Sequence, residues 1–104
     1  MKSGDIRWYK FKAPDKKRPV ILLTRDSILN YLGEVTVAPI TTIIRDIPSE
    51  VILTELNGLY KECAINLDHI QTVSKGKLGA LITTLSPEKM EKVRESFLFA
   101  LGFE

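Results

Sequence analysis

The sequence is poor in the residues from which many known sites are built. It contains one cysteine, Cys63, one histidine, His69, and one tryptophan, Trp8. A single cysteine excludes an internal disulfide and any metal site that needs several cysteines. A single histidine excludes a ribonuclease mechanism with two histidines, and with one cysteine it makes a zinc site unexpected. The net charge of +2 at pH 7 excludes a polycation, so local clusters must carry any affinity for phosphate.

Long apolar runs and a glycine-rich phosphate loop are also lacking. No stretch approaches the roughly 20 apolar residues of a membrane span. The start, Met1 to Arg7, has basic residues but no apolar run, so we expect a cytoplasmic protein without a signal peptide. Gly76 and Gly79 lie close together without the strand-to-helix pattern of a phosphate loop. The length of 104 residues predicts a single domain, residues 1–104.

The chain is organised around the stretch Val35–Arg45, which is apolar and β-branched at its start and uncharged before Arg45. Pro39 lies in its middle. Since proline cannot donate to a sheet ladder, we expect an edge or a bulge there, with the strand stopping at that point. Two interpretations remain open on these residues alone: a Thr-rich turn, or a rigid strand end that presents Thr41 and Thr42 to a ligand.

Five further segments have the length and composition of strands. They are Ile6–Phe11, Val20–Thr24, Glu50–Thr54, Leu59–Ile65 and Leu67–Val73. The continuous apolar run Val20–Thr24 indicates a strand buried on both faces. Asn57 and Gly58 predict a tight hairpin turn, because both residues accept a positive φ.

A helix is predicted at the end of the chain. Ser86 is a good N-cap, Pro87 suits the first helical position, and Gly102 is a plausible stop. Apolar residues recur at helical spacing and predict a core or dimer contact: Met90, Val93, Phe97 and Leu101. About six short strands followed by this helix predict a mostly antiparallel, strongly curved sheet, that is, a small open barrel capped by the helix.

Cations and hydroxyl groups collect at the expected strand ends. The group consists of Arg18, Thr41, Thr42, Arg45, Gln71 and Thr72, with Asp68 and His69 close by. Guanidinium groups bind phosphate oxygens bidentately and stabilise the charge of a five-coordinate transition state. Aromatic residues such as Trp8 or Tyr9 could stack an unpaired base. The pattern suits a phosphodiester, although ordinary solvated turns remain an alternative on spacing alone.

Four short motifs occur in a familiar order. They are Gly4-Asp5-Ile6-Arg7-Trp8, Arg18-Pro19-Val20, Pro39-Ile40-Thr41-Thr42 and Asp68-His69-Ile70-Gln71-Thr72-Val73, before a helix entered by Leu85-Ser86. With them the chain resembles, nearly end to end, the MazF/PemK family of toxin ribonucleases from bacterial toxin–antitoxin pairs. The resemblance implies a mainly β (α+β) fold, a small curved antiparallel SH3-like barrel with a C-terminal helix. It also implies a homodimer and a cognate antitoxin, which we expect to lay an acidic, extended peptide across the basic groove.

The resemblance further implies metal-independent, sequence-specific cleavage of single-stranded RNA without a cofactor. It places the catalytic arginine on Arg18 and the catalytic threonine on Thr41. The implied attack of a ribose 2′-OH on the adjacent phosphate leaves a 2′,3′-cyclic phosphate and a 5′-OH. Arginine is a poor proton donor, so we expect Arg18 to stabilise charge. The residues expected to bind substrate are Trp8, Lys16, Lys17, Thr42, Arg45, Asp68, His69 and Gln71.

Two departures from the family pattern affect these expectations. The loop from Lys12 to Lys17 is shorter than the family's usual insertion, which bears on sequence preference. His69 stands where the family commonly has glutamine, and could contact substrate, exchange a proton or fill a structural role, which we favour slightly. Two other functions are kept as alternatives: a CcdB-like toxin that binds gyrase without catalysis, and a small-barrel module that binds RNA without cutting it.

Overall fold

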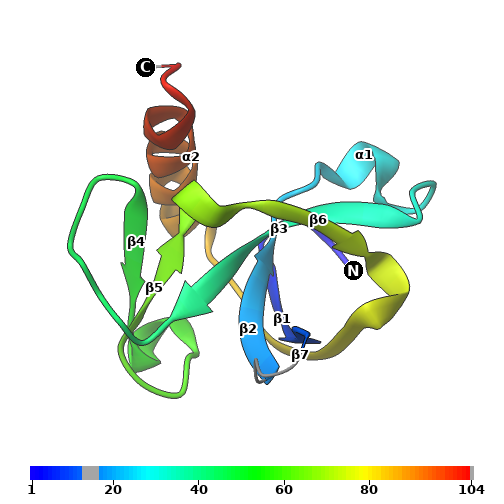
Figure 1. Ribbon diagram of the computed structural model, residues 1–104, viewed down its shortest axis with the longest axis horizontal. Coiled ribbons are helices and arrows are strands. Elements are labelled where there is room, and N and C mark those ends of the chain that lie inside the picture. The colour runs from blue at the N-terminus through cyan, green and yellow to red at the C-terminus, as the bar shows by residue number, and fades with distance from the viewer. Residues whose placement is uncertain (13–16, 104) are drawn as a thin grey trace.

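The computed structural model describes residues 1–12 and 17–103, and shows a curved antiparallel sheet with a helix beside it (Figure 1). The strands are β1 (Asp5–Lys10), β2 (Lys17–Leu22), β3 (Glu34–Thr41), β4 (Glu50–Leu53), β5 (Cys63–Asn66), β6 (Gln71–Ser74) and β7 (Leu78–Thr84). The helices are α1 (Asp26–Leu29) and α2 (Pro87–Leu101), with 3-10 turns η1 (Glu55–Asn57), η2 (Leu67–His69) and η3 (Lys75–Lys77).

The seven strands form one unclosed sheet in the order β4-β5-β3-β2-β1-β7, with β6 also pairing with β3. Every pairing is antiparallel. The mainly β architecture with a C-terminal helix that the sequence predicts is therefore confirmed. Neither described helix is long and apolar enough to cross a membrane.

Strand β3 is central, and Pro39 does not stop it. Along one edge β3 pairs first with β6, as far as Val37, and then with β5 from Ile40 onward. Pro39 falls in the gap between these two ladders, where its missing N–H costs no strand hydrogen bond. The expectation of a strand that stops at Pro39 was wrong, since β3 continues to Thr41.

The sheet is buried on both faces where β2 and β3 run together. Ile21 packs in one apolar cluster with Ile40, Leu67 and Val93 of α2. Val20 packs in a second cluster on the opposite face. This alternation confirms that the apolar run at Val20 is a strand covered on both sides.

Helix α2 begins and ends as its sequence predicts. The Ser86 hydroxyl accepts a hydrogen bond from the Lys89 N–H at 3.2 Å, and Pro87 occupies the first turn. At the other end Gly102 has φ +78, and the Phe103 N–H bonds to the Leu98 carbonyl at 2.8 Å. A left-handed residue followed by this bond is the usual glycine stop of a helix.

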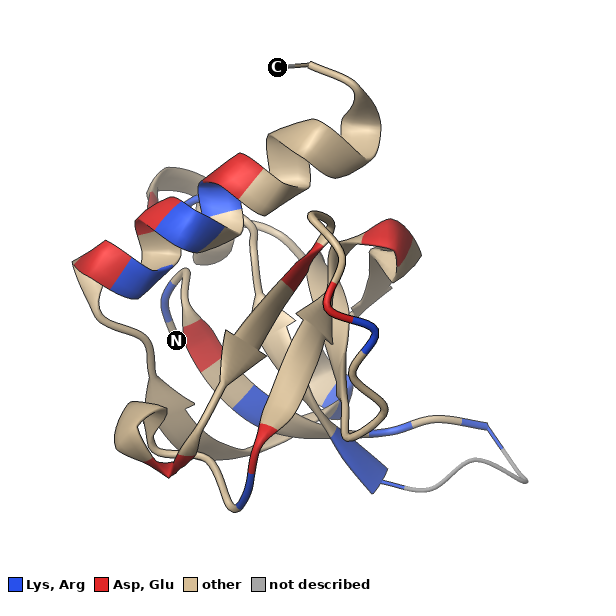
Figure 2. Cartoon of the chain, turned by 90° about the vertical axis from the view of Figure 1, so that its left-hand side faces the viewer, with Lys and Arg blue, Asp and Glu red and all other residues tan. Residues whose placement is uncertain are grey.

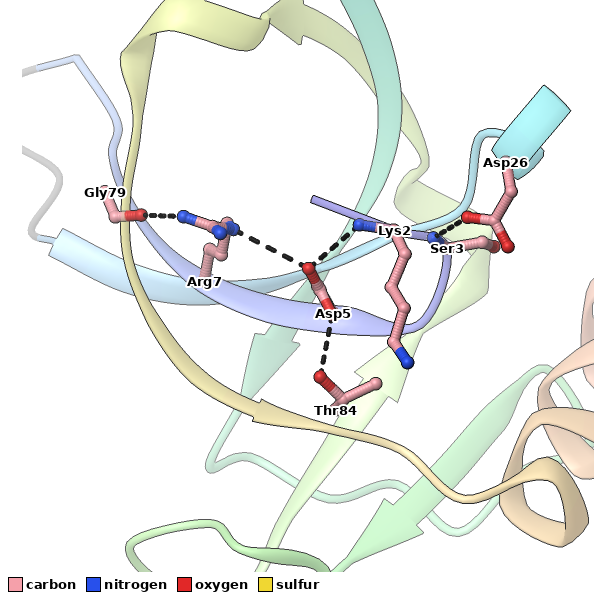
Figure 3. Close-up of polar contacts among 7 residues, drawn as sticks. All are labelled: Lys2, Ser3, Asp5, Arg7, Asp26, Gly79 and Thr84. Carbon is pink, nitrogen blue, oxygen red and sulfur yellow. Dashed lines mark hydrogen bonds and ion pairs between the residues drawn. The ribbon is translucent and has the colours of Figure 1, made fainter. Parts of the chain in front are cut away.

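Asp5 fixes the start of β1 (Figure 3). Its carboxylate is buried and accepts hydrogen bonds from the Thr84 hydroxyl at 2.7 Å and the Lys2 N–H at 3.0 Å. The Arg7 Nε lies 3.9 Å away, and the Arg7 guanidinium also donates to the Gly79 carbonyl at 3.0 Å. The Gly-Asp motif therefore has a structural part, joining β1 to β7.

Several elements differ from expectation. The predicted strand Leu67–Val73 begins as the 3-10 turn η2, and only β6 is a strand. Strand β7 has no counterpart among the predicted strands, since its sequence contains Gly79 and its pairing with β1 is irregular. Asn57 and Gly58 do not form a tight two-residue turn. Thr54 caps the 3-10 turn η1, whose Asn57 side chain bonds back to the Thr54 N–H at 2.9 Å, and Gly58 ends it with φ +93. Strands β4 and β5 do pair, but through a longer loop, and β5 begins only at Cys63.

Candidate active site

Arg18 and Thr41 come together because β2 and β3 are antiparallel neighbours. Val20 pairs with Pro39, so counting two residues outward on each strand brings Arg18 opposite Thr41. Side chains two apart along a strand share a face, so both project to the same side as Val20 and Pro39. The pairing of two adjacent strands thus places a guanidinium and a hydroxyl at one spot.

A cavity of about 200 Å³ opens there. Its wall contains Arg18, Pro39, Thr41, Ile43, Arg45, Asn66 and His69, and we call it the cationic cavity. Arg18 and Arg45 are both exposed, so their guanidinium groups are free to meet a solvated anion. Two arginines and a hydroxyl in one cavity wall form a site suited to a phosphate.

The Thr41 hydroxyl is held in place by the backbone that follows it. Its oxygen accepts a hydrogen bond from the Ile43 N–H at 3.1 Å. Since a hydroxyl has one donor hydrogen and two acceptor lone pairs, the hydrogen of Thr41 stays available for an acceptor in the cavity. Such a donor can hold a non-bridging phosphate oxygen.

Glu50 fixes the loop that carries Arg45. One oxygen of its buried carboxylate accepts hydrogen bonds from the Arg45 N–H at 2.9 Å and the Asp46 N–H at 3.2 Å. Asp46 has φ +55, a left-handed conformation that costs energy for a residue with a side chain. The carboxylate offsets this cost, and so determines where Arg45 stands beside the cavity.

The 3-10 turn η2 provides the other side of the wall. The Asn66 side-chain oxygen accepts from the Asp68 N–H at 3.0 Å, and the Ser49 hydroxyl donates to the Asp68 carboxylate at 2.6 Å. Asp68 is thereby bonded to the start of β4, and it is not among the residues of the cavity wall. His69 is exposed and does line the cavity, which favours a substrate contact over a buried structural role.

Basic residues gather at the adjoining ends of β1 and β2 (Figure 2). Lys10 and Lys17 lie directly opposite each other in the β1–β2 register, and Arg18 follows. Like charges in such a pair destabilise a sheet. An anion bound beside them would remove that penalty. Among the described residues, no group of three or more His, Cys, Asp or Glu side chains is placed to hold a metal ion.

The family model described as PemK-like, MazF-like toxin of type II toxin–antitoxin system matches residues 2–101. The chain belongs to this family. The resemblance that the four sequence motifs carry is therefore confirmed.

Individual members of the PemK/MazF family agree with this placement. Endoribonuclease MazF3 of Mycobacterium tuberculosis is 37% identical over 87 residues, which cover 80% of this chain and 84% of that protein. The solved structure of Mycobacterium tuberculosis toxin MazF-mt6 superposes with a TM-score of 0.88 at 33% identity, over 96% of this chain and 98% of that one. An endoribonuclease in complex with its cognate antitoxin from Mycobacterial species has a TM-score of 0.88 at 22% identity, over 100% of this chain and 97% of that one, and shows the shared fold.

A second cavity, of about 140 Å³, lies on the other side of Thr41 in this PemK/MazF chain. Its wall contains Trp8, Pro19, Ile40, Thr41, Thr42, Leu59, Tyr60, Lys61 and Cys63, and we call it the apolar cavity. The Lys17 ammonium lies 5.3 Å from the centre of the Trp8 ring, within the range of a cation–π interaction. Thr41 is the residue common to both cavity walls.

The structure divides the residues that the sequence suggested. Arg18, Thr41, Arg45 and His69 meet in the cationic cavity, while Trp8 and Thr42 lie in the apolar one. Gln71 is exposed on β6, in neither wall, and Lys16 lies outside the described residues. Sequence reasoning missed Asn66, whose signal was an amide side chain at the end of the otherwise apolar strand Cys63–Asn66.

Proposed function

We propose that this chain, as one domain over residues 1–104, is the toxin of a type II toxin–antitoxin pair and acts as an endoribonuclease on single-stranded RNA. The observation that carries the proposal is the register of β2 and β3, which sets Arg18 opposite Thr41 in a cavity shared with Arg45 and His69. Family membership supports the class of activity. A reaction on messenger RNA takes place in the cytoplasm and stops translation and growth.

In the proposed reaction the 2′-oxygen of a ribose attacks the adjacent phosphorus, and the bond from phosphorus to the 5′-oxygen breaks. Arg18 and Arg45 offset the negative charge that grows on the phosphorane, and the Thr41 hydroxyl donates to a non-bridging oxygen. The 2′-OH loses a proton and the 5′-oxygen gains one, so the products are a 2′,3′-cyclic phosphate and a 5′-OH.

Of the described residues in the cavity wall, His69 is the one that carries an imidazole, the side-chain type most often used as a general acid or base. Arginine is a poor proton donor, so Arg18 acts through its charge. His69 assists the proton transfers in this proposal, with water as the alternative proton carrier.

The alternatives receive less support. A gyrase-binding toxin of the CcdB type acts through the end of its last helix and needs no cationic cavity. A module that binds RNA without cutting it would use Arg18 for affinity alone. The presence of Thr41 and two arginines in one cavity wall favours a site that stabilises developing charge.

Two protein partners complete the proposal. The cluster Lys10, Lys17 and Arg18 suits an acidic, extended antitoxin segment. A homodimer is supported by the apolar end of α2, where Phe99 is 42%, Leu101 45% and Phe103 74% exposed. Sedimentation analysis of the purified chain measures the dimer directly.

The deciding experiment incubates purified protein with long mixed-sequence RNA in excess EDTA. We expect cleavage at short sequences and fragments whose 5′-OH ends are labelled by a polynucleotide kinase without prior phosphatase treatment. Intact RNA on several long substrates would overturn the ribonuclease proposal, and cutting that requires added metal would overturn the mechanism.

Variants separate catalysis from binding. Arg18→Ala is expected to lose cleavage and growth arrest while keeping part of its RNA affinity. Arg25→Ala is the matched control, because Arg25 is an exposed arginine at the start of α1, outside the wall of the cationic cavity. A fully active Arg18→Ala would show that Arg18 has no part in the reaction.

A further inference from the structure

The two cavities share a wall at Thr41 but differ in chemistry. The cationic cavity presents the guanidinium groups of Arg18 and Arg45. The apolar cavity is lined largely by rings and aliphatic side chains, among them Trp8, Pro19 and Leu59. An anion and a flat ring with apolar faces, joined by a short linker, would fill both.

A nucleotide has this form, because its phosphate and its base are attached to one ribose. We propose that the apolar cavity holds the nucleobase next to the phosphate bound at Arg18, and that Tyr60 stacks on that base. The inference rests on the proposed function, and it assigns to this one cavity the binding of a base beside the cleaved bond.

The size of the apolar cavity supports a single ring as its occupant. Its volume of about 140 Å³ is below the roughly 300–1,000 Å³ of pockets for larger organic ligands. Pro19 and Ile40 give it rigid walls, since they lie on the two strands that also carry Arg18 and Thr41. The distance between base and phosphate sites is therefore set by the sheet.

Tyr60 is placed for stacking and has no evident part in the fold. It contributes to the rim of the apolar cavity, yet the residue is 94% exposed, so its ring is free to cover a base. Stacking on an aromatic ring binds any unpaired base, because every base has a π face. Lys61 follows Tyr60 in the cavity wall, and the Lys17 ammonium lies over the Trp8 ring. Both add positive charge for the neighbouring phosphates of a bound RNA strand.

The test uses the wild-type cleavage site, mapped first on mixed-sequence RNA. Short oligonucleotides spanning it carry a 2′-deoxyribose at the cleaved position, so they bind without being cut. One oligonucleotide is intact, and each of the others lacks the base at one flanking position. Trp8 is the only tryptophan of the chain and lines the apolar cavity, so its fluorescence reports occupancy.

We expect the intact oligonucleotide to quench Trp8 fluorescence, and removal of one base beside the cleaved bond to abolish that quenching. Tyr60→Ala should weaken binding of the intact oligonucleotide by roughly 5- to 150-fold, the range for loss of one stacked base. For the oligonucleotide without that base, Tyr60→Ala should make little difference. Tyr31→Ala is the control, because Tyr31 is 85% exposed but lies after α1, outside the wall of the apolar cavity.

The outcomes keep the two proposals apart. If wild-type protein cuts RNA but every base-deleted oligonucleotide still quenches Trp8, or Tyr60→Ala binds as tightly as wild type, the base site is wrong and the ribonuclease stands. If wild-type protein does not cut RNA, there is no cleavage site to map. The oligonucleotides are then taken from the RNA segments that the protein binds. Position-specific quenching on them would support the base site alone, and uniform quenching would overturn it.

Discussion

Replacing Glu50 with alanine tests the support beneath the cationic cavity. In the native chain one carboxylate oxygen accepts two backbone hydrogen bonds, from Arg45 and Asp46. Hydrogen bonds to a charged group contribute about 1.5–3 kcal/mol each. The other oxygen is buried and has no partner among the described residues, a cost that the substitution removes. The net loss should therefore lie near the lower end for two bonds, about 3 kcal/mol.

This loss converts to a change in melting temperature. An unfolding entropy of about 2.1 cal/mol/K per residue gives a 104-residue chain about 0.22 kcal/mol/K. Glu50→Ala should then lower Tm by about 14 °C, measured by circular dichroism or calorimetry. Glu95→Ala, an exposed carboxylate on α2, is the control and should stay within about 2 °C.

The same variant tests whether the loop positions Arg45. At a temperature where Glu50→Ala is fully folded, kcat/KM for RNA should fall, because the Arg45 backbone is no longer held beside the cavity. A Tm within about 3 °C of wild type would refute the energetic reasoning. A lowered Tm with unchanged kcat/KM would show that Glu50 supports the fold and not the site.

Three further predictions concern single residues. Thr41→Val should lower kcat for RNA cleavage by about 100- to 1,000-fold, as loss of a transition-state donor does, while Thr41→Ser keeps most of the activity. Gly58→Ala should lower the free energy of unfolding by at least about 1 kcal/mol and Tm accordingly, because Gly58 has φ +93 and a Cβ there would lie 2.5 Å from the Thr83 hydroxyl. Burial, and secondarily the charge of Glu62, raise the pKa of Cys63 above its ordinary value of 9.0. The folded state therefore holds the thiol proton more tightly, so this contribution to stability is complete below pH 9.0 and is lost as the pH rises through the folded-state pKa. Urea midpoints of Cys63→Ala should show a smaller alkaline decline than those of wild type.

The meeting of Arg18 and Thr41 could be anticipated from the family resemblance, which pairs these two residues. Both also lie at the ends of apolar runs that predict strands. The structure makes those strands neighbours, and alternation then fixes which side chains share a face. Helix α2 could also be predicted from the sequence, because its ends are set by local residues, the N-cap Ser86 and the C-terminal Gly102.

What could not be anticipated depends on contacts between distant segments. Asn66 reaches the cationic cavity because it ends β5, which pairs with β3 at Ile40 and Thr41. Tyr60 reaches the apolar cavity because Thr54 and Asn57 cap a 3-10 turn where the dipeptide Asn57-Gly58 alone predicts a tight hairpin. Strand β7 pairs with β1, some seventy residues away, and its irregular register leaves no clear alternation to read.

The change of partner along β3 has a consequence for how the protein loses activity. β3 pairs with β5 at two positions, Ile40 with Ile65 and Thr41 with Ala64, but with β6 at four. The β4–β5 ribbon is thus attached to the rest of the sheet at Thr41 itself. Yet Val51, Leu53 and Ile65 of the ribbon are buried in the same core cluster as Ile21 and Val93, so this attachment opens only when that core opens. Opening would separate Cys63 and Leu59 from Trp8 and Pro19 and dismantle both cavities at once. Heating should therefore abolish RNA cleavage at the temperature at which the core melts, and amide exchange at the ribbon should be as slow as in β2.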